Sequence, residues 1–230
     1  MYNRTNFYQQ FSKTEIYSEI CKDYDFVLFD KHFVDVNLSL LDSQSATPRQ
    51  QMADRALKKT YFSAVPFYYL KFLTEKNPTT IYDLGCGWNI FKKYYSNIIG
   101  VGPEDPQHEF YNADINDYVD KHFVDTHQNY FESVFSIDAL HYHPLSDIKN
   151  IVLDFYSMIA PGGRGWLALN AARLVENDTN FIEKPTEFIE QYIKEQLETL
   201  PESVLLLDID LSCADNWMDG NIQIIFEKNH

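Results

Sequence analysis

The sequence predicts an α/β fold: a seven-stranded, mostly parallel sheet with helices on both faces, preceded by an N-terminal helical extension. From residue 80 onward, short apolar runs alternate with helix-periodic segments, which favours parallel strands joined by right-handed crossovers. The first run breaks into two glycines separated by one residue, Gly85 and Gly87, just before a helical-looking segment. The last two runs have no helix between them, so one of those strands should be antiparallel.

The composition limits the classes of partner. The chain has 230 residues, of which 45% are hydrophobic, enough to bury one sizeable core. Nineteen Lys and Arg against 34 Asp and Glu give a net charge of −15. Because nucleic-acid affinity comes largely from Lys and Arg at phosphates, this balance argues against DNA or RNA as the main partner.

The cysteines and the N-terminus predict the compartment. Three widely spaced cysteines, with no Cys-x-x-Cys pair, favour a reducing environment. The N-terminus is polar, and no run approaches the roughly 18 apolar residues of a membrane span. We therefore expect a soluble, cytoplasmic protein with no membrane partner.

Residues 1–75 predict a helical extension that packs on a core formed by residues 76–230. Residues 1–45 favour one or two helices, and a longer helix is predicted from Pro48 to about Lys76, kinked or divided at Pro66. This extension is rich in Tyr and Phe. We expect it to cap the substrate side of the core, as would suit a small-molecule substrate.

The core sequence contains seven strand-like runs. They are residues 80–84, 97–102, 109–114, 131–137, 165–169, 203–209 and 221–226. Helices are predicted at 90–95, after residue 114, after a Ser146 cap and at about 184–199. In the helix after Ser146 the apolar residues fall at helical spacing: Ile148, Ile151, Val152, Phe155 and Ile159.

These motifs, in this order, resemble those of the class I, Rossmann-like, S-adenosylmethionine-dependent methyltransferases. Asp83-Leu-Gly-Cys-Gly87 is similar to the first motif of that family, and Ala113-Asp114-Ile115 stands where the family places an acidic residue near adenine. Residues 136–141 resemble the segment after the fourth strand, and residues 160–163 the turn into the fifth. The resemblance covers about residues 79–228 and implies that the last, seventh strand is the antiparallel one.

The resemblance implies S-adenosylmethionine as cofactor and S-adenosylhomocysteine as product. The backbone of the glycine turn would pass close to the methionine moiety, with N–H groups for its carboxylate. Asp83 would accept from the amino group of the cofactor, Asp114 from the adenine amine, and the Ile115 N–H would donate to a ring nitrogen. The implied cofactor-binding residues are Asp83, Gly85, Cys86, Gly87, Gly102, Asp114, Ile115 and Asp138. Structural alternatives remain for the two acids, with Asp83 as a turn cap and Asp114 as a helix cap.

Two positions depart from the family pattern. Asn89 stands where the family often has a third glycine, although Asn tolerates a left-handed backbone better than most residues. Gly102 ends the second strand, where the family usually has an acid that binds the ribose hydroxyls. These departures favour an alternative function: a degenerate relative with weak or no cofactor binding that serves in interaction or regulation. A dinucleotide fingerprint is excluded because Ile90 replaces its third glycine.

Candidate catalytic groups follow the fourth predicted strand. His141 is the candidate general base, since its unperturbed pKa lies near neutrality; alternatively it packs against or caps the next helix. His141 and His143 lack an obvious third ligand, so no metal site is predicted. The Asn/Asp-Pro-Pro-Tyr/Phe signature of the DNA amino-methylating enzymes is absent after this strand, where the chain reads Asp138-Ala-Leu-His141. We expect methyl transfer to a small molecule, with the acceptor and the oligomeric state left open.

Overall fold

The structure is a computed structural model, and it describes residues 4–24, 26–28, 61–87, 89–103, 112–137, 139–140, 143–200, 204–210 and 221–229. The chain divides into two compact units, residues 1–72 and residues 73–230. The boundary expected from the sequence, after residue 75, lies close to this division. Each unit is described below by itself.

The described part of the first unit contains two helices, two short strands and most of a third helix. These are α1 (Arg4–Phe11), α2 (Glu15–Asp23), β1 (Phe26–Leu28), β2 (Tyr61–Ser63) and α4 (Val65–Thr74). β1 and β2 pair in parallel. The aromatic rings of α1 pack on those of α4: the ring centroids of Phe7 and Tyr68 lie 5.4 Å apart, and those of Phe11 and Phe67 lie 5.0 Å apart. The aromatic residues that distinguish this unit in the sequence therefore pack against one another.

The long helix predicted from Pro48 to Lys76 is wrong in its middle. Strand β2 occupies residues 61–63, and α4 begins only at Val65; residues 47–60 lie outside the described residues. Pro66 is the second residue of α4 and not a kink within a longer helix. Proline is tolerated there because the first N–H groups of a helix have no intrahelical acceptor.

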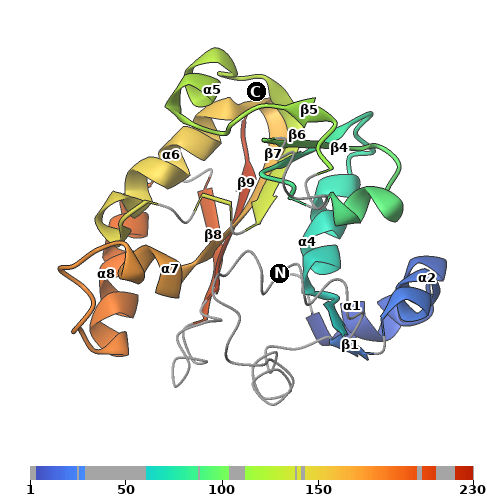
Figure 1. Cartoon of the computed structure of the whole chain (residues 1–230), viewed down its shortest axis with the longest axis horizontal. Helices are drawn as coiled ribbons and strands as arrows, with labels where there is room; N and C mark the ends of the chain where they lie inside the picture. Colours follow the sequence, from blue (N-terminus) through green and yellow to red (C-terminus); the bar gives the residue numbers. More distant parts are fainter. Residues whose placement is uncertain are drawn as a thin grey trace. The chain divides into compact units, whose positions relative to one another are not determined.

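The second unit is built on one sheet with the strand order β5-β4-β3-β6-β7-β9-β8 (Figure 1). Strand β9 is antiparallel to both of its neighbours, and all other adjacent pairs are parallel, which confirms the predicted sheet type and its antiparallel last strand. β5 has only two residues, so six longer strands form the body of this seven-stranded sheet. The strands are β3 (Ile81–Leu84), β4 (Ile98–Gly102), β5 (Ile115–Asn116), β6 (Phe131–Ile137), β7 (Ile159–Asn170), β8 (Val204–Asp210) and β9 (Asn221–Glu227).

Four helices lie together on one face of this sheet: α5 (Lys121–Thr126), α6 (Ile148–Met158), α7 (Ala171–Glu176) and α8 (Thr186–Glu198) (Figure 1). Their apolar side chains form one core with the inward-facing residues of the strands, among them Leu84, Val134, Leu167 and Ile224. On the other face, the ring of Phe91 in the 3₁₀ helix η1 (Ile90–Lys93) packs edge-on against the ring of Phe135, with 5.8 Å between the ring centroids. The sheet therefore buries side chains on both faces, as parallel sheets do.

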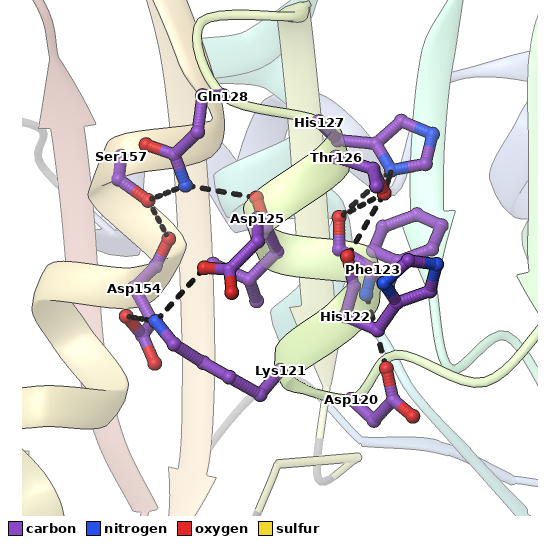
Figure 2. Close-up of polar contacts among 11 residues, drawn as sticks. Asp120, Lys121, His122, Phe123, Asp125, Thr126, His127, Gln128, Asp154 and Ser157 are labelled. Atoms are coloured by element: carbon purple, nitrogen blue, oxygen red, sulfur yellow. Dashed lines mark hydrogen bonds and ion pairs between the residues drawn. The ribbon is translucent and has the colours of Figure 1, made fainter.

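Polar contacts fasten α5 to α6 (Figure 2). The Lys121 ammonium lies 2.9 Å from the Asp154 carboxylate and 3.2 Å from that of Asp125. Just after the end of α5, Gln128 Nε2 donates at 2.9 Å to the Oγ of Ser157, which lies about one turn after Asp154 on α6. Asp120 is the N-cap of α5, and its side chain accepts the Phe123 N–H at 3.0 Å, so this short helix is held at its start as well as along its side.

Several predicted boundaries are corrected by the structure. The segment after the glycine turn is a 3₁₀ helix of four residues. The described strand nearest to the predicted run 109–114 is β5, which begins at Ile115; residues 112–114 are not in a strand, and residues 109–111 lie outside the described residues. Asp147, the last residue of the 3₁₀ helix η2 (Leu145–Asp147), takes the N-cap position of α6 that was expected for Ser146. Residues 161–163 belong to β7 because Gly162 N–H and Gly163 C=O bond with Lys228 of the chain end.

No helix in the described ranges combines the length and the apolar character that a membrane crossing requires.

Candidate functional site

The order of the strands marks one position at the edge of the sheet. From β3 the chain moves outward to β4 and β5, and it then returns to β6 on the other side of β3. In open α/β sheets, ligands bind beyond the carboxyl ends of the strands at such a reversal. The glycine turn after β3 and the segment after β6 both lie here. They are in close contact, since a Cβ added to Gly85 would collide with the side chain of Ala139.

The glycine turn uses three left-handed residues. Gly85, Gly87 and Asn89 have φ values of 77°, 49° and 51°. The expectation that Asn89 can take the place of a third glycine is confirmed in its backbone, with ψ at 38°. The N–H groups of Gly85 and Cys86 both donate to the Val101 carbonyl, at 2.8 and 3.0 Å. The Gly85 N–H, which was expected to be available to a ligand carboxylate, is therefore used, like that of Cys86, in holding the turn on β4.

Gly87 is the open point of the turn. A Cβ placed on it would meet nothing within 4 Å among the atoms that the structure describes, in contrast to the packed Gly85. A ligand can approach the Gly87 backbone closely because none of the described side chains covers it.

Asp83 is a buried carboxylate that receives no hydrogen bond from the described residues. It lies on β3 between Gly100 of β4 and Phe135 of β6, and it is only 4% exposed. Within the described part of the chain no group donates a hydrogen bond or an ion pair to its carboxylate, so it does not act as a turn cap there. Burial raises the pKa of Asp83 to about 8. A cationic ligand group beside it would restore the ionised form.

Asp114 has partners at both carboxylate oxygens. Oδ2 accepts the Gly100 N–H at 2.8 Å and the Asn89 amide at 2.9 Å, and Oδ1 pairs with the Lys92 ammonium. Burial opposes ionisation, but the hydrogen bonds from Lys92, Gly100 and Asn89 lower the pKa of Asp114 below its ordinary value. Asp114 is not the cap of the helix that follows, since Asp120 caps α5.

The remaining predicted cofactor residues surround these two acids. Ile115 pairs with Val101 at the start of β5, and its side chain is 42% exposed. Gly102 has room for a side chain, because an added Cβ would lie 3.6 Å from the Cys86 sulfur. Burial, with the charges of Asp83 and Asp114, raises the pKa of the Cys86 thiol to about 12, so this cysteine is no thiolate nucleophile.

The candidate catalytic segment is described in part. Asp138 and His141 lie outside the described residues, whereas Ala139 and Leu140 are placed after β6, with Ala139 against the glycine turn. His143 is described and is exposed on the surface. No group of three or more metal-ligating side chains occurs within the residues that the structure covers.

Sequence reasoning missed the residues that support the site. Gly100, Lys92 and Asn112 contact the turn or Asp114, and Ser136 Oγ donates to the Leu84 carbonyl at 2.8 Å across β6 and β3. Of these residues, only Gly100 could have been found from the local sequence, because a glycine inside an apolar strand indicates a close approach of another segment. The other three could not, because their partners are distant in the sequence.

Comparisons with known proteins give remote similarities. No protein-family model and no curated sequence matches the chain. Among solved structures, the chain is similar to a SAM-dependent methyltransferase from Archaeoglobus fulgidus, with 13% identity, a TM-score of 0.42, and coverage of 84% of this chain and 100% of that one.

Two further solved structures are similar to the same degree. One is a putative S-adenosyl-L-methionine-dependent methyltransferase from Methanococcus maripaludis, with 14% identity, a TM-score of 0.42, and coverage of 72% of this chain and 85% of that one. The other is the CurJ carbon methyltransferase, with 12% identity and a TM-score of 0.42; the match covers 72% of this chain and only 52% of the CurJ chain.

Proposed function

We propose that this protein is an S-adenosylmethionine-dependent methyltransferase that acts on a small molecule. The observation that carries the proposal is Asp83, which is only 4% exposed and receives no hydrogen bond from the described residues, beside the open Gly87 at the reversal of strand order. A carboxylate kept out of water without a donor is destabilising, and such groups are retained where a ligand completes them. The first motif and the antiparallel last strand support the same assignment.

The residues present suit S-adenosylmethionine. Asp83 would accept from the ammonium of the methionine moiety, which would pass over the open backbone of Gly87. Oδ2 of Asp114 already accepts two hydrogen bonds, so only Oδ1, shared with Lys92, has room to accept the adenine amine. When bound, the cofactor supplies a methyl group on a sulfonium, activated for displacement. The protein contributes mainly the alignment of the acceptor with that methyl group.

We assign the base that accepts the proton of the acceptor to His141. Ala139, two residues before it, packs on Gly85, so the segment that carries His141 starts at the glycine turn. Asp138, which directly precedes Ala139 in the sequence, is proposed as a cofactor-binding residue. The N-terminal extension, residues 1–75, is proposed as the cap that covers a small-molecule acceptor, and the cytoplasm as the compartment.

Thermal unfolding with S-adenosylhomocysteine tests the proposal. A ligand at 100 times its dissociation constant adds about 2.7 kcal/mol to the free energy of unfolding, which corresponds to a rise in Tm of about 5–10 °C in a protein of this size. Asp83→Asn removes the negative charge and keeps an acceptor oxygen, so the affinity should fall about 10–100-fold.

The matched control is Glu132→Gln, which removes an exposed charge from the neighbouring strand β6 and should leave the ligand-induced rise unchanged. An unchanged Tm of the wild-type protein in millimolar S-adenosylhomocysteine and S-adenosylmethionine would contradict the proposed function. Equal affinity in Asp83→Asn would show that the site lies elsewhere.

A further inference from the structure

Asn89 has a buried side chain whose contacts a glycine could not make. It stands in the left-handed region at φ 51° and ψ 38°, and the residue is only 5% exposed. Its amide nitrogen donates to the Asn112 carbonyl at 3.0 Å and to Asp114 Oδ2 at 2.9 Å. A residue chosen only for its tolerance of positive φ would need neither contact.

The surrounding backbone is shaped to receive this amide. A Cβ on Gly100 would lie 2.7 Å from both Cγ and Nδ2 of Asn89, so the absence of a side chain on β4 creates the space for the amide. The Gly100 N–H donates to Asp114 Oδ2, and the Asp114 N–H donates back to the Gly100 carbonyl, both at 2.8 Å. The Asn112 N–H donates to the Gly87 carbonyl at 3.1 Å, which ties the same segment to the open point of the turn.

We propose that Asn89 and Asp114 form a polar lock that holds the glycine turn in its ligand-ready conformation. Asn89 is a positioning residue, and it acts on the turn through Asp114 and Asn112. Lys92 completes the lock at the other oxygen of Asp114. The effect of the lock on cofactor binding rests on the proposed function. The effect of the lock on the conformation of the turn does not, because it concerns the protein without ligand.

The lock and simple backbone tolerance predict opposite effects of glycine at position 89. Glycine adopts a positive φ without strain, so tolerance alone predicts that Asn89→Gly leaves Tm unchanged or raises it. The lock predicts that Asn89→Gly lowers Tm by about 2–4 °C, since Asp114 Oδ2 and the Asn112 carbonyl each lose the donor that Asn89 provides. The matched control is Asn77→Gly: Asn77 is also left-handed, at φ 51°, but is exposed, and the structure records no side-chain hydrogen bond for it. Its Tm should change by less than about 1 °C.

A double-mutant cycle of Asn89→Gly and Asp114→Ala measures the coupling. Ala at position 114 removes both carboxylate oxygens, so Asn89 loses its acceptor at Oδ2 and Lys92 loses its partner at Oδ1. The effects on Tm should be clearly less than additive, because each substitution breaks the same contact. Additive effects, or an Asn89→Gly protein at least as stable as the wild type, would overturn the lock.

The positioning role of Asn89 is tested separately, by measuring the dissociation constant of S-adenosylhomocysteine at a temperature well below Tm. Asn89→Gly should weaken binding about 10-fold while circular dichroism shows an intact fold, and Asn77→Gly should bind normally. Unchanged binding in Asn89→Gly would overturn the positioning role. If the wild-type protein binds neither cofactor form but the Tm cycle is non-additive, the lock stands and the proposed function fails.

Discussion

At the scale of single residues, Asp83 and Asp114 show how two acids of one site are set to different tasks. Asp83 is buried without a donor, and its pKa is raised to about 8; Asp114 collects three donors, and its pKa is lowered. Desolvation dominates at Asp83 because β3 is a central strand, covered on both sides, whereas Asp114 lies next to the edge strand β5. Asp83 is therefore the group that most needs a cationic ligand.

The raised pKa of Asp83 predicts a specific pH dependence of stability. Between about pH 4 and pH 8 the folded protein keeps a proton on Asp83 that the unfolded chain has lost, so the free energy of unfolding falls as the pH rises through this window. Asp83→Asn removes this pH-dependent fall in the free energy of unfolding, because an asparagine side chain does not ionise. The variant should match the wild type near pH 4 and exceed it at pH 8 by an amount on the order of a few kcal/mol, measured by urea unfolding at both pH values. Equal stability at pH 8 would contradict the buried, unpartnered state of Asp83.

At the scale of elements, β4 carries two glycines with different surroundings. A Cβ on Gly100 would meet the Asn89 amide and the Cys86 sulfur at 2.7 Å, whereas on Gly102 the nearest atom would lie at 3.6 Å. Glycine at position 100 therefore makes room for the side chains of the glycine turn, whereas position 102 has space for a side chain of its own. The departure from the family pattern at Gly102 is consequently not enforced by packing.

This contrast predicts opposite outcomes for two alanine substitutions. Gly102→Ala should leave stability unchanged or raise it by about 0.5–1 kcal/mol, since alanine restricts the unfolded chain. Gly100→Ala should cost about 1–3 kcal/mol, because the added methyl overpacks the site and pushes the Asn89 amide away from Asp114. Thermal or urea unfolding of the two variants checks this directly, each serving as the control for the other. Similar losses in both would refute the difference in packing.

At the scale of the whole molecule, a charge network joins the start of the second unit to its last strand. Arg164 on β7 lies 3.1 Å from Glu75 and 3.3 Å from Glu227 of β9, and Lys76 lies 2.8 Å from Glu227. Glu75 and Lys76 directly precede the run into β3, so the network links the first and last segments of residues 73–230. The hydrogen bond from Lys76 is the main cause of the lowered pKa of Glu227.

Removal of the central charge of this network should destabilise the protein modestly. The lowered pKa of Glu227 contributes stability above its unfolded pKa, near 4.5, and that contribution is lost as the pH falls through the folded value. Glu227→Gln should cost about 0.5–1 kcal/mol at pH 7, since Glu227 is partly exposed, and nearly nothing near pH 3. Glu190→Gln, which removes only a surface pair with Lys194, should cost less at pH 7. An equal loss in both variants would show that the network adds nothing beyond an isolated pair.

Features that depend on residues close together in the chain could be predicted from the sequence. Apolar runs and helical spacing placed β3, β4, β6, α6 and α8, and the missing crossover indicated the antiparallel strand. The glycine turn, with Asn89 in the left-handed region, also followed from local backbone chemistry. The interruption of the predicted 48–76 helix by β2 did not, because β2 is stabilised by its pairing with β1, more than thirty residues earlier.

Only the tertiary structure decided what the site residues do. The sequence assigned Asp83 and Asp114 similar acceptor roles, but the sheet left one without a donor and gave the other three. The space for the Asn89 amide exists because β4 lies beside β3 and brings Gly100 under the turn. Which strands become neighbours fixes burial and hydrogen-bond partners, and these depend on contacts between residues far apart in the chain that no local pattern records.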